Sequence, residues 1–217
     1  PYWRLSAYYF FYFAFVGAFS PYFALYLQSI ALSATDIALL MSLMQLMRVL
    51  APNLWGWLAE HLGMRIAIVR LSALASLAGF SVFFLTTDFA GLFAAMALMA
   101  FFWSAALPLI EGLAFAHLGE ASHRYGSIRV WGSVGFIVAV VWGGALLDYL
   151  PIGDVPAMVF AVLIGILVMA FKLPEERRQA AISRDLPVTE DTPLATLGSI
   201  VRERQVWMVM LACFLMA

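Results

Sequence analysis

Six long apolar stretches dominate this sequence and limit how the chain can fold. They cover residues 5–27, 37–59, 67–85, 91–116, 128–147 and 155–171. A helix needs about 17–25 mostly apolar residues to cross a bilayer, where each backbone polar group must be satisfied internally. Because 65% of the residues are hydrophobic and only 12% are charged, the composition excludes an ordinary soluble domain. We therefore predict an all-α membrane protein with a bundle of six transmembrane helices.

The segment after the sixth stretch has a different composition. Residues 172–205 are polar, and residues 206–217 are apolar but too short to cross a bilayer. We predict a six-helix bundle in residues 1–171, a cytoplasmic linker in residues 172–205 and the start of a truncated seventh span in residues 206–217. A sequence that begins without methionine and stops inside an apolar stretch is typical of a fragment.

The basic residues are distributed unevenly between the two sides of the membrane. With alternating helices, eleven of the twelve fall at or toward the side that holds the amino terminus and the linker: Arg4, Arg65, Arg70, Arg124, Arg129, Lys172, Arg177, Arg178, Arg184, Arg202 and Arg204. Lysine and arginine favour the cytoplasmic side of a membrane. We therefore expect a multi-pass protein of the inner (cytoplasmic) membrane with its amino terminus in the cytoplasm.

Arg48 is the exception, because it lies at the middle of the second apolar stretch. It is twelve residues from both Asp36 and Glu60, or about 18 Å from each along a helix. A charged side chain at that depth costs on the order of 2.5–3.5 kcal/mol and usually faces a partner or a water-filled cavity. Arg48 therefore indicates a polar interior; the alternative is that it only fixes helix packing.

Glu111 is a second ionisable residue within a predicted span, and Arg129 is its expected partner. The turn between the fourth and fifth spans is centred near Glu120, nine residues from each of them. Equal separation from the turn of an antiparallel helical hairpin gives equal depth, so the two side chains can face each other. A buried carboxylate needs such a partner or a proton. The pair is either an element that a substrate or proton opens, a permanent structural clamp, or a solvated pair near the headgroups.

Aromatic residues suggest further contacts for a ligand. The first span carries a stripe at near-helical spacing that includes Tyr12 and Phe19, and Phe136 lies two turns beyond Arg129 on about the same face. Such a stripe either lines a cavity or packs in the core. The sequence shows no phosphate loop, catalytic serine–histidine pair or paired zinc histidines. We expect no enzyme activity, cofactor, metal or nucleic-acid partner.

Residues 56–65 follow the second predicted span and read GWLAEHLGMR. This segment resembles the signature loop of the major facilitator superfamily, with Gly56, Glu60, Gly63 and Arg65 as the matching positions. Glu60 replaces the usual aspartate. By this resemblance the four residues would form a gating loop on the cytoplasmic side.

The second motif consists of PLIE at residues 108–111 and YGSIRVWGSVGF at residues 125–136. Its spacing from Glu111 to Arg129 resembles the lactose permease branch, where the corresponding pair binds sugar and a tryptophan stacks at the position of Phe136. The sequence around Arg129, the aromatic first span and the arginine at position 48 resemble the phenylpropionate permease branch more closely. The resemblance implies the amino-terminal half of a twelve-helix transporter that works by alternating access, with a missing carboxyl-terminal six-helix half.

The leading functional hypothesis is a proton-coupled symporter of a small organic substrate such as an aromatic carboxylate. Two arginines and one carboxylate within the spans suit an anionic ligand, so Arg48 or Arg129 would attract it and Glu111 would bind it or exchange a proton. A sugar or nucleoside proton symporter is the alternative. The alternative of another class is a non-transporting membrane receptor or assembly subunit.

Overall fold

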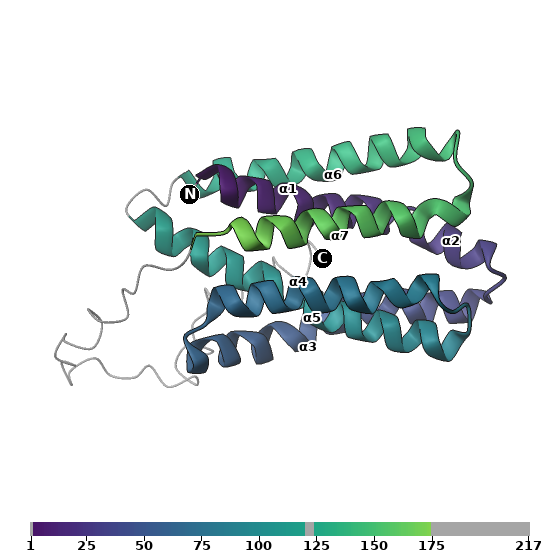
Figure 1. Cartoon of the computed structure of the whole chain (residues 1–217), viewed down its shortest axis with the longest axis horizontal. Coiled ribbons are helices and arrows are strands. Elements are labelled where there is room, and N and C mark those ends of the chain that lie inside the picture. Colours follow the sequence, from purple (N-terminus) through teal and green to yellow (C-terminus); the bar gives the residue numbers. More distant parts are fainter. Residues whose placement is uncertain (1, 120–123, 175–217) are drawn as a thin grey trace, which may run out of the picture. The chain divides into compact units, whose positions relative to one another are not determined.

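All regular structure in the described residues, 2–119 and 124–174 of this computed structural model, is helical (Figure 1). In chain order the elements are α1 (Tyr2–Phe19), α2 (Phe23–Ser29), α3 (Ala34–Leu62), α4 (Arg65–Ser81), η1 (Val82–Phe84), α5 (Phe89–Leu118), α6 (Tyr125–Leu147), η3 (Ile152–Asp154) and α7 (Val155–Lys172). They lie in one compact unit. The predicted linker and seventh span fall almost wholly outside the described residues and stay predictions.

Six helical segments of the described residues are long and apolar enough to cross a membrane, which confirms the predicted fold class. The first differs from the prediction because it is not continuous. α1 ends at Phe19 and α2 begins at Phe23, with a turn that contains Pro21 between them. Proline has no backbone N–H and disrupts the preceding turn of a helix. Hydropathy does not detect this break because residues on both sides remain apolar.

The helices form two layers of three. α1 packs on α6 and α7, while α5 packs on α3 and α4. Figure 1 shows these two groups one above the other, and contacts between α4 and α7 join them. Further connections come from side chains, such as the Tyr12 ring of α1, which stacks on Trp103 of α5 with centroids 4.5 Å apart. Tyr12 also lines a pocket together with Arg48 and Glu111.

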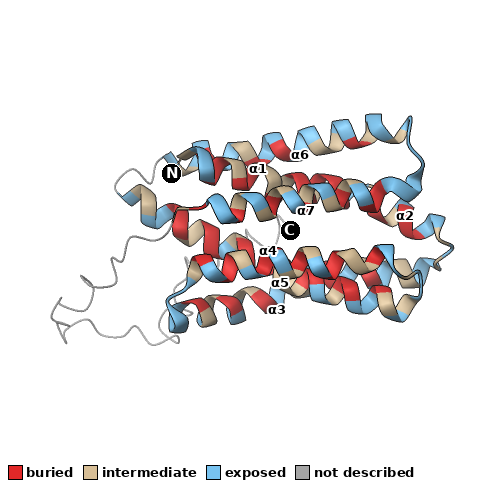
Figure 2. Cartoon of the chain, viewed as in Figure 1, coloured by how far each residue is buried: buried red, intermediate tan, exposed pale blue. Residues whose placement is uncertain are grey.

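Burial is uneven among the helices. The spans that contain α1, α4 and α5 are the most buried of the six candidate spans, whereas α3 and α6 are the least buried (Figure 2). The exposed side chains of α3 and α6 are nonetheless large and apolar; they include Leu46, Val49, Leu50, Leu54 and Trp57 on α3 and Val130, Ile137, Val141 and Trp142 on α6. Contiguous exposed apolar surface of this kind marks contact with lipid or with another protein surface.

Glycines allow α1 and α6 to approach closely. A Cβ atom on Gly17 of α1 would lie 2.6 Å from the backbone oxygen of Phe136, and one on Gly135 of α6 would overlap the backbone oxygen of Phe10. Membrane helices use small residues to bring backbones together, since lipid supplies no hydrophobic drive between helices. Close packing on α1 therefore sets where α6, and with it Arg129, lies.

Candidate functional site

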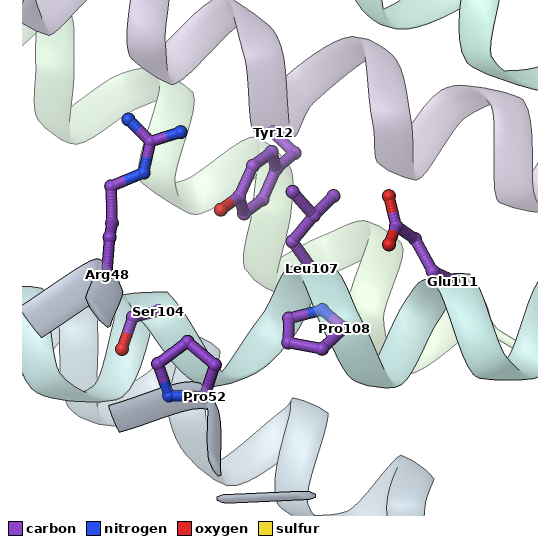
Figure 3. A pocket seen from close by; sticks show the side chains of 7 residues that line it. All are labelled: Tyr12, Arg48, Pro52, Ser104, Leu107, Pro108 and Glu111. Carbon is purple, nitrogen blue, oxygen red and sulfur yellow. The ribbon is translucent and has the colours of Figure 1, made fainter. Parts of the chain in front are cut away.

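A pocket of about 240 Å³ lies between the two layers, and we call it the interlayer pocket (Figure 3). Its lining residues come from α1, α3 and α5: Tyr12, Arg48, Pro52, Ser104, Leu107, Pro108 and Glu111. In Figure 3 the Tyr12 ring lies between Arg48 on one side and Glu111 on the other. The pocket thus combines an aromatic face, a cation and a carboxylate within an otherwise apolar bundle.

Two prolines shape the walls of this pocket. Pro52 lies inside α3 and Pro108 lies inside α5. A proline inside a helix removes the hydrogen bond to the carbonyl four residues earlier and bends the helix. The carbonyls that lose this bond belong to Arg48 and Ser104, which both line the pocket. The prolines therefore add two backbone acceptors to helix turns that border it.

Arg48 is held only loosely by the described part of the chain. Its Nη1 atom donates to Oε1 of Gln45 at 3.4 Å, and the residue is exposed. No bond from Arg48 to Glu111 is among the hydrogen bonds and ion pairs of the described residues. The Arg48 guanidinium therefore keeps most of its donor capacity for a ligand or for water.

Glu111 and Arg129 form the ion pair expected from their equal distance to the turn. Nη1 of Arg129 donates to Oε1 of Glu111 at 3.3 Å. The Arg129 side chain is 52% exposed and the Glu111 side chain 33% exposed, so the pair is partly open rather than sealed in the core.

The other predicted aromatic contacts are distributed differently. Tyr12 lines the interlayer pocket, but Phe19 is buried and stacks on Phe15 and Phe23 with centroids 5.3 and 4.5 Å away. Phe136 is 39% exposed and does not line the pocket. Most of the first-span stripe therefore packs in the core, and only Tyr12 of these three reaches the pocket.

The predicted gating loop joins α3 to α4. Gly63 ends α3 with a left-handed backbone at φ 61°, a conformation that favours glycine, and its N–H donates to Ala59 O at 3.0 Å. Arg65 starts α4 and reaches α5, where its Nη1 atom lies 3.9 Å from the place a Cβ on Gly112 would occupy. Glu60 is exposed, and Gly56 has open space beside it. The loop therefore contacts the helix that carries Glu111.

Sequence reasoning missed several residues around the site. Pro52, Ser104 and Leu107 line the pocket, and the hydroxyl of Tyr125 contacts both Glu111 and Arg129. The spacing of four residues between Tyr125 and Arg129 was the available signal, because it places both on one helix face. The described residues contain no group of three His, Cys, Asp or Glu side chains that could hold a metal ion.

A bundle of apolar helices with ionisable side chains around an internal pocket is typical of multi-pass membrane transporters. The chain belongs to the major facilitator superfamily, since residues 2–217 match the family described as MFS_1 like. The predicted amino-terminal half of such a transporter is thereby confirmed.

Curated relatives support this family assignment. The chain is 34% identical over 169 residues to the maltose permease of Geobacillus stearothermophilus. This alignment covers 77% of this chain and 42% of that protein. It is 28% identical over 193 residues to the uncharacterized transporter YwbF of Bacillus subtilis strain 168. This alignment covers 84% of this chain and 46% of that protein. It is also 28% identical over 164 residues to the probable 3-phenylpropionic acid transporter of Escherichia coli K12. This alignment covers 74% of this chain and 43% of that protein.

The chain spans less than half the length of these relatives. Their names describe permeases and transporters rather than enzymes, and two of the names give a small molecule, maltose and 3-phenylpropionic acid. Family, relatives and helices together make this a multi-pass membrane protein of a transporter family.

Proposed function

We propose that this chain forms the amino-terminal half of a proton-coupled symporter that binds a small organic substrate in the interlayer pocket. The observation that carries the proposal is the joint lining of one pocket by Tyr12, Arg48 and Glu111, with Arg129 bonded to Glu111. Ionisable groups inside a membrane bundle are costly and mark substrate or proton pathways. Alternating access would come from rocking this half against the second half.

An aromatic carboxylate is the substrate class that the charges favour. Two arginines and one carboxylate leave a formal surplus of one positive charge at the site, and Arg48 has unused donors beside the pocket. A guanidinium can bind a carboxylate through two parallel hydrogen bonds, and the Tyr12 ring offers a surface for an aromatic group. The similarity to a probable 3-phenylpropionic acid transporter supports this substrate class.

A sugar or nucleoside is the second candidate, and different observations favour it. The relative with 34% identity is a maltose permease. Hydroxyl groups need acceptors. The lining residues include Glu111, with its carboxylate, and Arg48 and Ser104, whose backbone carbonyls lack the N–H donor that Pro52 and Pro108 cannot supply. We rank this candidate second because hydroxyl recognition leaves the charge of Arg48 unbalanced.

Glu111 is the residue that we propose for proton coupling. It is the only carboxylate that lines the interlayer pocket in the described part of the chain. Gain of a proton would neutralise the charge that holds Arg129, so protonation and opening of the ion pair would be linked.

The loop between α3 and α4 would form a cytoplasmic gate next to α5, with Gly56, Glu60, Gly63 and Arg65 as its residues.

The second half of the transporter is the proposed partner of this chain. A volume of about 240 Å³ is below the range of about 300–1,000 Å³ usual for small-molecule sites, as expected of half a site. The exposed apolar faces of α3 and α6 would contact that half, and the remaining outer surface would contact lipid. We place the protein in the cytoplasmic membrane with its amino terminus and the linker, residues 172–205, on the cytoplasmic side.

Uptake by the full-length parent protein in proteoliposomes tests the proposal. Radiolabelled phenylpropionate and maltose are compared, each with and without an inward proton gradient. Accumulation of phenylpropionate driven by the gradient would support the proposal, while accumulation of maltose alone would favour the second candidate. Full binding without transport of either compound would support a receptor or assembly subunit instead.

A further inference from the structure

The hydroxyl group of Tyr125 lies at the centre of a cluster that consists of Tyr9, Glu111, Tyr125 and Arg129. It donates to Oε1 of Glu111 at 3.1 Å and accepts from Nη1 of Arg129 at 3.4 Å. Arg129 also donates directly to the same Oε1 atom. Tyr125 therefore contacts both members of the ion pair.

Tyr9 of α1 anchors this cluster from inside the bundle. Its hydroxyl lies 3.2 Å from that of Tyr125, and the residue is fully buried. A tyrosine hydroxyl has one proton, and the Tyr125 proton is directed to Glu111. Tyr9 must then be the donor in the contact between the two tyrosines. Each hydroxyl proton thus has one defined acceptor.

Ring contacts fix Tyr125 independently of these hydrogen bonds. Phe115 of α5 stacks on the Tyr125 ring with centroids 4.5 Å apart, and the Tyr9 ring meets it edge-on at 6.3 Å. Aromatic pairs in such geometries contribute beyond their buried area. The ring, and not only the hydroxyl, therefore holds α6 against both α1 and α5.

The hydrogen bonds leave one oxygen of Glu111 available. Both bonds that the carboxylate accepts from described residues end on Oε1, and Oε2 accepts none from them. Glu111 also lines the interlayer pocket. α6 packs mainly on α1 and has few contacts with α5. Tyr125 of α6 bonds to Tyr9 of α1 and to Glu111 of α5, so it controls how Arg129 of α6 meets Glu111.

We propose that Tyr125 is a positioning residue of the substrate site: its hydroxyl holds Oε1 of Glu111 beside Arg129 and so keeps Oε2 available to substrate or proton in the interlayer pocket. This role rests on the proposed function. Tyr125 does not line the pocket, so it acts through Glu111.

The Tyr125→Phe variant of the full-length protein tests the role, because it removes the hydroxyl and keeps the ring contacts with Phe115 and Tyr9. Tyr22→Phe is the matched control. The Tyr22 hydroxyl also reaches α6, where it donates to Val140 O at 2.6 Å, but it does not contact Glu111. Tyr22→Phe removes one hydroxyl bond to α6, whereas Tyr125→Phe removes the contacts of its hydroxyl with Tyr9, Glu111 and Arg129. Only Tyr125→Phe therefore affects Glu111.

Infrared spectroscopy of the purified protein without substrate provides the first measurement. The difference spectrum between the wild type and Glu111→Gln assigns the carboxylate bands of Glu111, and the same difference is recorded in the Tyr125→Phe and Tyr22→Phe backgrounds. We expect shifted Glu111 bands with Tyr125→Phe and unshifted bands with Tyr22→Phe. Unshifted bands in both backgrounds would overturn the proposal, whether or not the protein transports either compound.

Uptake kinetics with radiolabelled phenylpropionate and maltose provide the second measurement. Loss of a hydrogen bond to a charged group should raise KM for the transported compound about tenfold or more with Tyr125→Phe, with little change in maximal rate. An equal loss of maximal rate in both variants would indicate a purely structural tyrosine and contradict the proposal. If Tyr125→Phe does not fold, Tyr9→Phe replaces it, and a smaller shift of the same Glu111 bands is then expected.

Discussion

At the scale of single residues, Arg48 and Arg129 have different environments although both are arginines near the same pocket. Arg129 is bound to Glu111 and Tyr125, so its charge is balanced. Arg48 has Gln45 as its hydrogen-bond partner within the described residues, at 3.4 Å. Removal of Arg48 should therefore affect a ligand more than it affects the fold.

Replacement of Arg48 by alanine tests this distinction in the full-length protein. We expect insertion and thermal stability to stay close to wild type, and uptake to fall about 10- to 150-fold if the guanidinium binds an anionic substrate through charge-assisted hydrogen bonds. Arg48→Lys should recover part of the uptake, because it keeps the charge without the planar fork. Gln45→Ala is the control that removes the neighbour alone. Unchanged uptake in Arg48→Ala would remove this residue from the site.

At the scale of the helices, the contact between α1 and α6 depends on backbone approach at glycine. A Cβ on Gly135 would overlap the backbone oxygen of Phe10, whereas one on Gly126 of the same helix would meet nothing within 4 Å. Backbone atoms cannot move aside as the end of a flexible side chain can. The two glycines therefore form a matched pair for testing this interface.

Gly135→Ala should destabilise the protein by about 1–3 kcal/mol through overpacking. Gly126→Ala should be neutral or stabilising by up to about 1 kcal/mol, since alanine is the better helix former. Denaturation midpoints of both variants in detergent, compared with wild type, check the expectation. Equal midpoints for the two variants would show that α1 and α6 separate more easily than their packing indicates.

The sequence predicted the helices well and their rotations poorly. Membrane thickness sets the length of each apolar stretch, so the six spans were recognisable, and the chain geometry of a hairpin placed Glu111 opposite Arg129. A helix that is apolar on all sides carries little information about which face is buried. For this reason the burial of Phe19 and the inward position of Tyr125 required the structure, as did the break at Pro21.

At the scale of the whole molecule, the two layers leave α3 and α6 with large apolar side chains that this chain does not cover. Val49 of α3 is 71% exposed and Ile137 of α6 is 58% exposed. Leu74 of α4 is similarly exposed, at 51%, but belongs to a well-buried helix. If α3 and α6 face the second half of the transporter, the first two positions should be shielded from lipid and Leu74 should contact it.

Spin labels at these three positions of the full-length protein in liposomes separate the two environments. Collisions with oxygen, which concentrates in the hydrocarbon of a bilayer, should broaden the signal from position 74 strongly and the signals from positions 49 and 137 weakly. The same labels on this 217-residue chain alone should all respond strongly, because the shielding surface is then absent. Equal oxygen access at all three positions of the full-length protein would mean that α3 and α6 face lipid. Arg48 of α3 lines the interlayer pocket. If α3 faced lipid, another part of the protein would have to close the pocket.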